Sequence, residues 1–255
     1  MLDRSPMNTH AVSGPRLGLL AFVLVLVFTG PASWAGPASP TAGAAPTKIG
    51  IIGAGNIGGT LARLWVASGH DVLVSSRHPD QLKPLCAELG PRCHVGTPHD
   101  AAVFSNVVLI SVPYAALPQI GRDLKAALAG KVVLDTGNPY PGRDGPMAEE
   151  ARKKGTGAAS AALLPGVRLV RAFNAINAGD LGRLGRRKPS LVAIPLAGDD
   201  AEALKIASAL VRDAGFDPVI VGGLARARDF DVGTPVYTKV MSAAELRKAL
   251  GLAAH

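Results

Sequence analysis

The stretch Lys48-Ile-Gly-Ile-Ile-Gly53-Ala-Gly55-Asn-Ile-Gly58-Gly59 decides the fold of this chain. Residues 48–52 predict a short buried strand. Residues 60–68 carry apolar side chains at helical spacing, and a glycine at position 69 ends the predicted helix. Residues 71–75 then predict a second strand. A strand, a glycine-rich turn, a helix and another strand within about 30 residues form a βαβ unit.

Each glycine of the Gly-x-Gly-x-x-Gly turn has a physical task in such a unit. Gly53 makes the tight turn, Gly55 lets the backbone approach a pyrophosphate, and Gly58 lets the helix pack closely against the strand. Free N–H groups at the start of the helix then bind the anion. The alternative is a structural turn without ligand, because a glycine-rich chain produces this pattern by chance. The predicted dinucleotide-binding residues are Gly53, Ala54, Gly55, Asn56, Ile57 and Gly58.

The end of the second strand indicates which dinucleotide is bound. An NAD site places Asp or Glu about 20 residues after the glycines, where it binds the ribose hydroxyls. This chain instead has Ser75, Ser76 and Arg77, so hydroxyls can donate to a 2′-phosphate and a guanidinium can pair with it. We therefore expect NADP rather than NAD. The same residues also fit a helix-capping loop before Pro79, and the two interpretations are compatible.

The rest of the chain continues the alternation of strands and helices. This alternation predicts an α/β fold, a three-layer Rossmann-type doubly wound parallel sheet, over residues 48–221. Residues 222–255 form a small C-terminal appendage in this prediction. The predicted strands are residues 107–112, 131–134, 167–173, 191–196 and 218–221, and the predicted helices are residues 79–89, 115–128, 201–214 and 243–250.

Polar residues gather at the carboxyl ends of the predicted strands, where sheets of this type bind ligands. Ser111 ends one strand, residues 135–139 follow the next, and Asn174 follows a third. Asp135 and Asn174 are candidate polar groups at an acceptor molecule. The alternative for both is that they only cap neighbouring backbone.

These motifs together resemble the NADP-binding reductases that use the deazaflavin coenzyme F-420. That group includes related NADPH-dependent ferric reductase domains. The resemblance covers most of residues 48–223. It is carried by the glycine turn, Ser75-Ser-Arg77, Ile110-Ser-Val-Pro113, Asp135-Thr-Gly-Asn-Pro139 and Leu169-Val-Arg-Ala-Phe-Asn174.

The resemblance implies hydride transfer between NADPH and a deazaflavin, a flavin or a similar small acceptor. It places the pyrophosphate at residues 54–57 and the 2′-phosphate at residues 75–77. Enzymes of this kind hold two rings face to face and need no obligatory acid or base, so no catalytic residue is assigned. The residues that it implies at the nicotinamide side are Ser111, Val112, Pro113, Tyr114, Asn138 and Pro139.

The N-terminal residues predict export. A basic start, an apolar run over residues 17–28 and the pair Ser33 and Ala35 predict a secretory signal peptide over residues 1–35. The alternative is an uncleaved anchor, which would be the chain's only contact with a membrane. Residues 36–47 predict a linker rich in Pro, Ala and Gly.

An exported position, periplasmic or secreted, conflicts with a cofactor whose pool we expect in the cytoplasm. A second hypothesis therefore describes an exported nucleotide-binding protein without redox turnover. The two hypotheses differ in whether NADPH is oxidised when an acceptor is present.

Composition and charge argue against other partners. Aromatic residues make up 4% of the chain, too few for a stacking single-strand binder. The net charge of +8 falls to +7 without residues 1–47, which contribute only Arg4, Arg16 and Asp3. The remaining charge is spread and no nucleic-acid motif is present, so we expect no nucleic-acid partner. The histidines show no metal-ligand spacing, and a homodimer is compatible with the sequence.

Two features leave alternatives open. Cys86 and Cys93 either form a disulfide, which an oxidising compartment permits, or remain two buried thiols. Residues 183–188 form a basic loop that either meets an acidic coenzyme tail or is simply solvated.

Overall fold

The computed structural model describes residues 47–253. The expected signal segment, residues 1–35, and nearly all of the expected linker, residues 36–47, lie outside this range. Within it, no helix combines the length and the apolar character needed to span a membrane.

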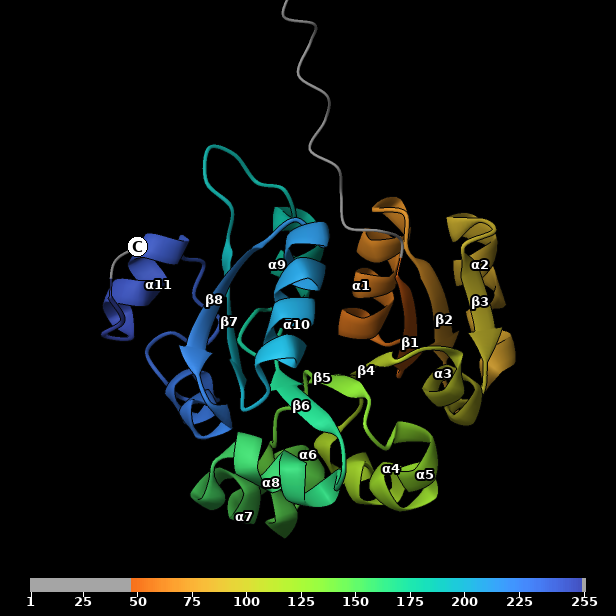
Figure 1. Cartoon of the computed structure of the whole chain (residues 1–255), viewed down its shortest axis with the longest axis horizontal. Coiled ribbons are helices and arrows are strands. Elements are labelled where there is room, and N and C mark those ends of the chain that lie inside the picture. Colours follow the sequence, from red (N-terminus) through yellow and green to blue (C-terminus); the bar gives the residue numbers. More distant parts are fainter. Residues whose placement is uncertain (1–46, 254–255) are drawn as a thin grey trace, which may run out of the picture. The chain divides into compact units, whose positions relative to one another are not determined.

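Eight strands form one sheet in the described part of the chain, in the order β3-β2-β1-β4-β5-β6-β7-β8. All neighbours from β3 to β6 in this order pair in parallel, which confirms the expected Rossmann-type fold. The chain order reverses between β1 and β4, and such a switch point is where these sheets bind ligands. The strands, drawn in Figure 1, are β1 (Lys48–Ile52), β2 (Asp71–Ser75), β3 (Cys93–Gly96), β4 (Val107–Ile110), β5 (Val132–Asp135), β6 (Arg168–Arg171), β7 (Ala193–Gly198) and β8 (Asp217–Gly222).

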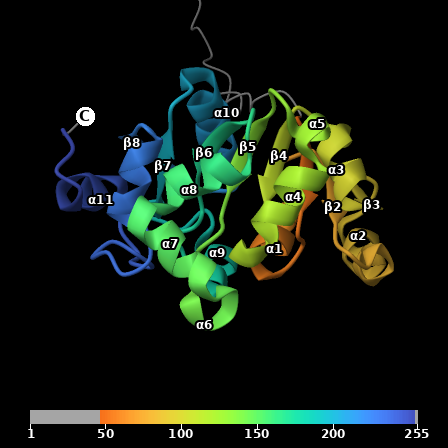
Figure 2. The ribbon, with the colours of Figure 1, turned by 90° about the horizontal axis from the view of Figure 1, so that it is seen from below.

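Helices cover both faces of the sheet and produce the three expected layers. One apolar cluster includes side chains of α1, α9 and α10, and Figure 1 shows α1 and α10 side by side. A second cluster on the other face includes α3, α4, α7 and α8, which Figure 2 shows from below. The α-helices are α1 (Asn56–Ala67), α2 (Lys83–Leu89), α3 (Pro98–Phe104), α4 (Leu117–Asp123), α5 (Lys125–Leu128), α6 (Pro141–Asp144), α7 (Pro146–Lys154), α8 (Thr156–Leu163), α9 (Ala178–Leu184), α10 (Ala201–Asp213) and α11 (Ala243–Ala249), and the 3-10 helices are η1 (Pro79–Leu82), η2 (Tyr114–Ala116) and η3 (Leu224–Phe230).

Local packing explains why β1 and α1 form where the sequence predicts them. Ile49 and Ile51 of β1 are fully buried in the same cluster as Trp65 of α1. The indole N–H of Trp65 donates to the carbonyl oxygen of Leu210 in α10 at 2.8 Å. On the other face, a Cβ at Gly50 would lie 2.0 Å from a backbone oxygen of α3, so a side chain there would push α3 away from β1.

One pairing differs from the predicted parallel sheet. β7 runs antiparallel to β6, with Val170 opposite Gly198, whereas β8 is parallel to β7. The connection from β6 to β7, residues 172–192, contains the seven-residue α9, which packs against α1. It does not return to the edge of the sheet where β6 begins, as a parallel crossover does, so β7 runs in the opposite direction.

Other differences are local. The predicted helix over residues 115–128 is divided into η2, α4 and α5, with a non-helical Leu124 between the last two. Helices α6 to α9 and strand β3 were not expected. A capping box begins α3, because Thr97 and Asp100 bond reciprocally there. The predicted appendage packs through η3 and α11 on β7 and β8, where Phe230 and Leu246 join a third apolar cluster.

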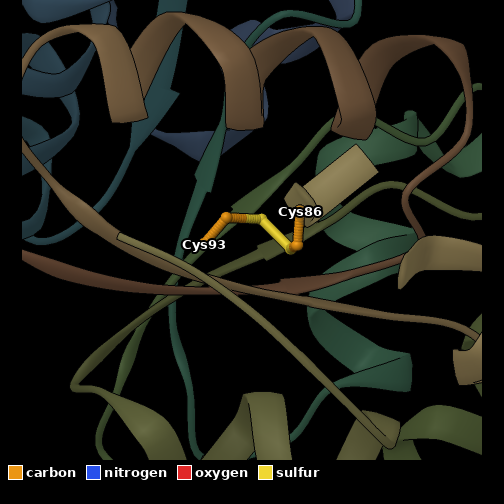
Figure 3. Close-up of a disulfide and its surroundings, with 2 residues drawn as sticks. All are labelled: Cys86 and Cys93. Atoms are coloured by element: carbon orange, nitrogen blue, oxygen red, sulfur yellow. A yellow bond between two sulfur atoms is a disulfide. The ribbon is translucent and has the colours of Figure 1, made fainter. Parts of the chain in front are cut away.

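Cys86 and Cys93 form a disulfide, which decides between the two alternatives for these residues (Figure 3). Cys86 lies in α2 and Cys93 is the first residue of β3, the strand that pairs with β2. The bond therefore ties α2 to the edge of the sheet, directly after the residues expected to bind the 2′-phosphate. The described residues contain no free cysteine.

We expect reduction of this disulfide to destabilise the protein by about 2–3 kcal/mol, the chain-entropy value for so short a loop. Urea unfolding of the oxidised and reduced wild-type protein measures the difference. The variant Cys86→Ser/Cys93→Ser provides the control, because its unfolding free energy should no longer respond to reductant. Equal stability of oxidised and reduced wild type would contradict the expectation.

Candidate cofactor site

The glycine turn between β1 and α1 has the geometry that its sequence predicts. Gly53 has a φ of +96°, a conformation that side chains disfavour, and its N–H donates to the carbonyl oxygen of Ser75 at 3.1 Å. A Cβ at Gly53 would lie 2.3 Å from the backbone oxygen of Ser111. A Cβ at Gly58 would lie 2.1 Å from the backbone oxygen of Gly53, so α1 packs directly on the turn.

The N-terminus of α1 is open to a ligand. Gly55 is the N-cap residue, no side chain caps the first turn, and that turn contains no acidic residue. The first N–H groups of the helix therefore lack a protein acceptor and attract an anion. Gly55 is exposed and a Cβ built on it meets nothing within 4 Å, so the space above it is free for a pyrophosphate. The residues present fit the phosphate groups of a dinucleotide.

Of the three residues at the end of β2 that are expected to bind the 2′-phosphate, two have side chains that can reach a ligand. Ser75 is fully buried and its hydroxyl donates to the carbonyl oxygen of Ile51 at 2.8 Å, so the expectation that it binds phosphate is corrected. The Oγ of Ser76 accepts from the N–H of His78 at 3.0 Å, which leaves its own O–H able to donate. Arg77 is exposed. Ser76 and Arg77 are the groups that fit the phosphate.

A cleft of about 540 Å³ continues from the N-terminus of α1 across the ends of β4, β5 and β6. Eight of the residues expected to bind the cofactor or the acceptor line this cleft, and they follow the carboxyl ends of β1, β4, β5 and β6. These are Gly55, Asn56, Ile57, Ser111, Val112, Pro113, Asn138 and Asn174. The cleft therefore joins the phosphate-binding turn to the expected nicotinamide side.

Three expected residues lie behind the cleft wall. Tyr114 is fully buried, and its hydroxyl accepts from that of Ser160 at 3.3 Å. Burial raises the pKa of Tyr114 to about 12. Pro139 is buried as well and does not line the cleft. Asp135 is fully buried.

Asp135 belongs to a buried ion cluster rather than to an acceptor site. Arg171 donates to a carboxylate oxygen of Asp135 at 2.7 Å, and both side chains are fully buried. A second nitrogen of Arg171 lies 3.5 Å from Asp231 in the C-terminal appendage. The other carboxylate oxygen of Asp135 accepts from the N–H of Gly137 at 2.7 Å. Asp135 thus shapes the turn that carries Asn138 into the cleft.

Asn138 and Asn174 are joined at the expected acceptor side. The amide nitrogen of Asn138 donates to the backbone oxygen of Asn174 at 2.7 Å and to the hydroxyl of Tyr237 at 3.3 Å. Asn174 follows Phe173, whose positive φ of 59° turns the chain at the end of β6. The ring of Phe173 meets that of Trp65 edge-on at 6.2 Å, so the apolar core holds this turn.

Sequence analysis missed the group that closes the cleft, Tyr140, Arg143 and Tyr237. The hydroxyls of Tyr140 and Tyr237 share a hydrogen bond. The guanidinium of Arg143 lies 5.1 Å from the ring centre of Tyr140 and pairs with Asp144 at 2.8 Å. Burial raises the pKa of Asp144, but its bonds with Arg143 and with backbone N–H groups outweigh this and hold it below its usual value.

No sequence signal points to this group, because Tyr237 is 97 residues from Tyr140. The basic loop over residues 183–188, in contrast, contributes nothing to the cleft lining. Arg183 pairs with Asp180, and Arg186 donates to the hydroxyl of Ser68 at 2.7 Å. The structure therefore favours the interpretation of a surface loop.

The fold and the open helix terminus define a dinucleotide-binding protein, and the comparisons with known proteins identify its family. Residues 48–139 match the family described as NADP oxidoreductase, coenzyme F420-dependent, so this segment of the chain belongs to that family. The chain is also 30% identical over 190 residues to the rat metalloreductase STEAP3, a match that covers 72% of this chain and 36% of STEAP3. The chain thus spans about a third of that relative's length.

Two solved structures share the fold over nearly their whole length. A hypothetical protein, SMa0349, from Sinorhizobium meliloti has a TM-score of 0.65 and 25% identity, covering 78% of this chain and 96% of its own. A provisionally described F420-dependent NADP-reductase from Arthrobacter sp. FB24 has a TM-score of 0.64 and 24% identity, covering 81% and 96%. Both structures show that the chain shares this Rossmann-type fold.

We expect Gly55→Ala to weaken NADPH binding at least about tenfold without loss of stability. The added methyl group meets nothing in the free protein but occupies the space through which the pyrophosphate reaches the helix terminus. Gly182→Ala is the matched control, because its Cβ would make only an ordinary contact, 3.7 Å from Thr60, on the exposed side of α9. Fluorescence titration with NADPH and thermal unfolding measure the two properties. Unchanged affinity in Gly55→Ala would show that the pyrophosphate binds elsewhere.

Proposed function

We propose that the protein transfers a hydride between NADPH and a deazaflavin, a flavin or a similar ring acceptor. The observation that carries the proposal is the continuity of the cleft from the helix terminus at Gly55 to Tyr237. One continuous space allows a nicotinamide and a second ring to lie in contact. Family membership supports the use of NADP, and the acceptor is our own inference.

The residues of the chain would bind and orient the reactants. The N-terminus of α1 would hold the pyrophosphate, and Ser76 with Arg77 would hold the 2′-phosphate. Ser111, Val112 and Pro113 line the side of the cleft where the nicotinamide would lie. When bound, NADPH supplies a hydride. Placing two rings in contact provides much of the catalysis in such a reaction, because it converts a bimolecular step into a unimolecular one.

We also propose that the protein works outside the cytoplasm. The basic and apolar N-terminal residues support this proposal, and so does the disulfide between Cys86 and Cys93, because such bonds persist in oxidising compartments. Recovery of the mature protein from cell fractions tests it. An intact N-terminus in the cytoplasmic fraction would exclude export.

Arg77→Ala should lower the preference for NADPH over NADH about tenfold or more, because Arg77 would pair with the 2′-phosphate that NADH lacks. Titration of both nucleotides against wild type and variant gives the ratio. Arg92→Ala is the matched control: Arg92 is also exposed, but it directly precedes β3, and its guanidinium donates to the carbonyl oxygen of Gly69 and to Asp71, at the opposite end of β2 from Arg77. Equal preference in wild type and Arg77→Ala would place the 2′-phosphate elsewhere.

The proposed reaction predicts NADPH oxidation when F-420 or a flavin is added. Absorbance at the NADPH band, followed with F-420, FMN and ferric citrate in parallel, measures it. Turnover with the ring acceptors supports the proposal. NADPH binding without turnover on any acceptor would instead support an exported nucleotide-binding protein.

A further inference from the structure

We propose that the Tyr140–Tyr237 pair donates a hydrogen bond and then a proton to a heteroatom of the acceptor, so that the acceptor is an organic two-electron acceptor. This inference rests on the proposed hydride transfer. It assigns a catalytic role to two residues of the cleft and narrows the class of acceptor.

The hydrogen bonds of Asn138 determine which way its amide points. Its amide nitrogen lies 2.7 Å from the backbone oxygen of Asn174, and a carbonyl oxygen can only accept a hydrogen bond. The amide nitrogen therefore faces Asn174, and from that position it also donates to the hydroxyl oxygen of Tyr237 at 3.3 Å. The oxygen of Tyr237 is thus an acceptor whatever the position of its own hydrogen.

One of the two hydroxyl hydrogens of Tyr140 and Tyr237 is not used in the hydrogen bond between them. Tyr140 and Tyr237 together carry two hydroxyl hydrogens, and one of them lies in the bond between the two oxygens. Within residues 47–253, neither hydroxyl donates to any other group in the hydrogen bonds of the structure. Both residues line the cleft, so the remaining hydrogen is available there to water or to a ligand.

The other residues of the cleft wall supply no comparable acid. Among the described lining residues, Arg143 is the only one with a charged side chain, and an arginine does not give up its proton. The lining residues within 47–253 include no carboxylate and no histidine. Its remaining hydroxyls belong to serine and threonine, whose protons are held more tightly than that of a phenol. A proton delivered inside the cleft therefore comes from the tyrosine pair.

The surroundings of Tyr237 keep its phenol protonated before the reaction. Burial and the hydrogen bond with Tyr140 raise the pKa of Tyr237, while Arg171 and Arg143 oppose the shift. The phenol therefore stays protonated at neutral and mildly alkaline pH. Arg143, above the ring of Tyr140, is placed to stabilise negative charge on the pair after a proton leaves.

The proposed step balances in atoms and charge. The acceptor gains a hydride, with its two electrons, from the reduced nicotinamide at a ring atom, a carbon in a deazaflavin or a nitrogen in a flavin. It gains one proton at a ring heteroatom as the O–H bond of the pair breaks. Water restores the proton through Tyr140, which is exposed. A ferric ion takes single electrons and no proton, so it would gain nothing from this pair.

The test compares wild type with Tyr140→Phe, Tyr237→Phe and the double variant. With 5-deazariboflavin as the probe, we expect the double variant to lose about 100-fold or more in kcat, the usual range for a general acid. Its rate should also fall about tenfold per pH unit from pH 6 to 9, because its proton must come from solvent, whereas the wild-type rate should stay flat. The single variants should lose less, since each retains one phenol.

Two further measurements separate this inference from the proposed function. Binding of 5-deazariboflavin to the NADP⁺-loaded proteins, followed by fluorescence, should weaken at least about fivefold in the double variant, with NADPH affinity unchanged. This readout needs no turnover, so it remains decisive if no acceptor is reduced.

The affinity for NADPH, titrated by fluorescence, serves as the comparison and should be the same in all four proteins. A double variant with a flat pH profile and wild-type binding of 5-deazariboflavin would overturn the inference. So would a parallel loss of affinity for 5-deazariboflavin and for NADPH, since that would indicate a misplaced cofactor.

Discussion

The acceptor side of the cleft depends on the ion pairs of one buried guanidinium, that of Arg171. It pairs with Asp135 at the end of β5 and with Asp231 in the C-terminal appendage, so it joins three parts of the chain that are far apart in sequence. A buried charge is costly unless it is paired and hydrogen-bonded, and this cost makes the arrangement specific. Because Asp135 also holds the N–H of Gly137, the cluster sets the turn that presents Asn138. Arg171 thereby determines indirectly where the tyrosine pair lies.

At the other end of the cleft, the constraint is steric rather than electrostatic. A Cβ at Gly53 or at Gly58 would collide with backbone atoms, so both positions require glycine. A Cβ at Gly55 would meet no protein atom, so the space there is free for a ligand. These three positions leave the first N–H groups of α1 exposed to solvent. The cleft thus has two ends of different origin. One end is an anion site at the N-terminus of α1 that fits the pyrophosphate of a dinucleotide, and the other is an acceptor side formed by residues that are far apart in sequence.

Much of the fold could be predicted from the sequence because its signals are local. The apolar runs of β1, β2 and β4, and the amphipathic pattern of α10, report burial of adjacent residues and need no knowledge of distant partners. The direction of β7 could not be predicted in this way, because the residues of a strand do not specify the direction in which it pairs with its neighbour. The role of Ser75 was wrong for a similar reason. Its hydroxyl bonds to Ile51 in the neighbouring strand, and a strand's own sequence does not specify that contact.

The sequence by itself determined the dinucleotide turn, because the conformations open to glycine and the exposed N–H groups of a helix start follow from a dozen consecutive residues. It also determined the basic and hydroxyl-bearing end of β2 that favours NADP. Only the tertiary structure decided which polar residues reach the cleft. Asp135 ends a strand at the ligand-binding edge of the sheet, but its carboxylate is buried in an ion pair with Arg171. Tyr237 forms a hydrogen bond with Tyr140, which is 97 residues away in the sequence. Such contacts exist only after the appendage has folded back onto the sheet, so no pattern along the chain records them.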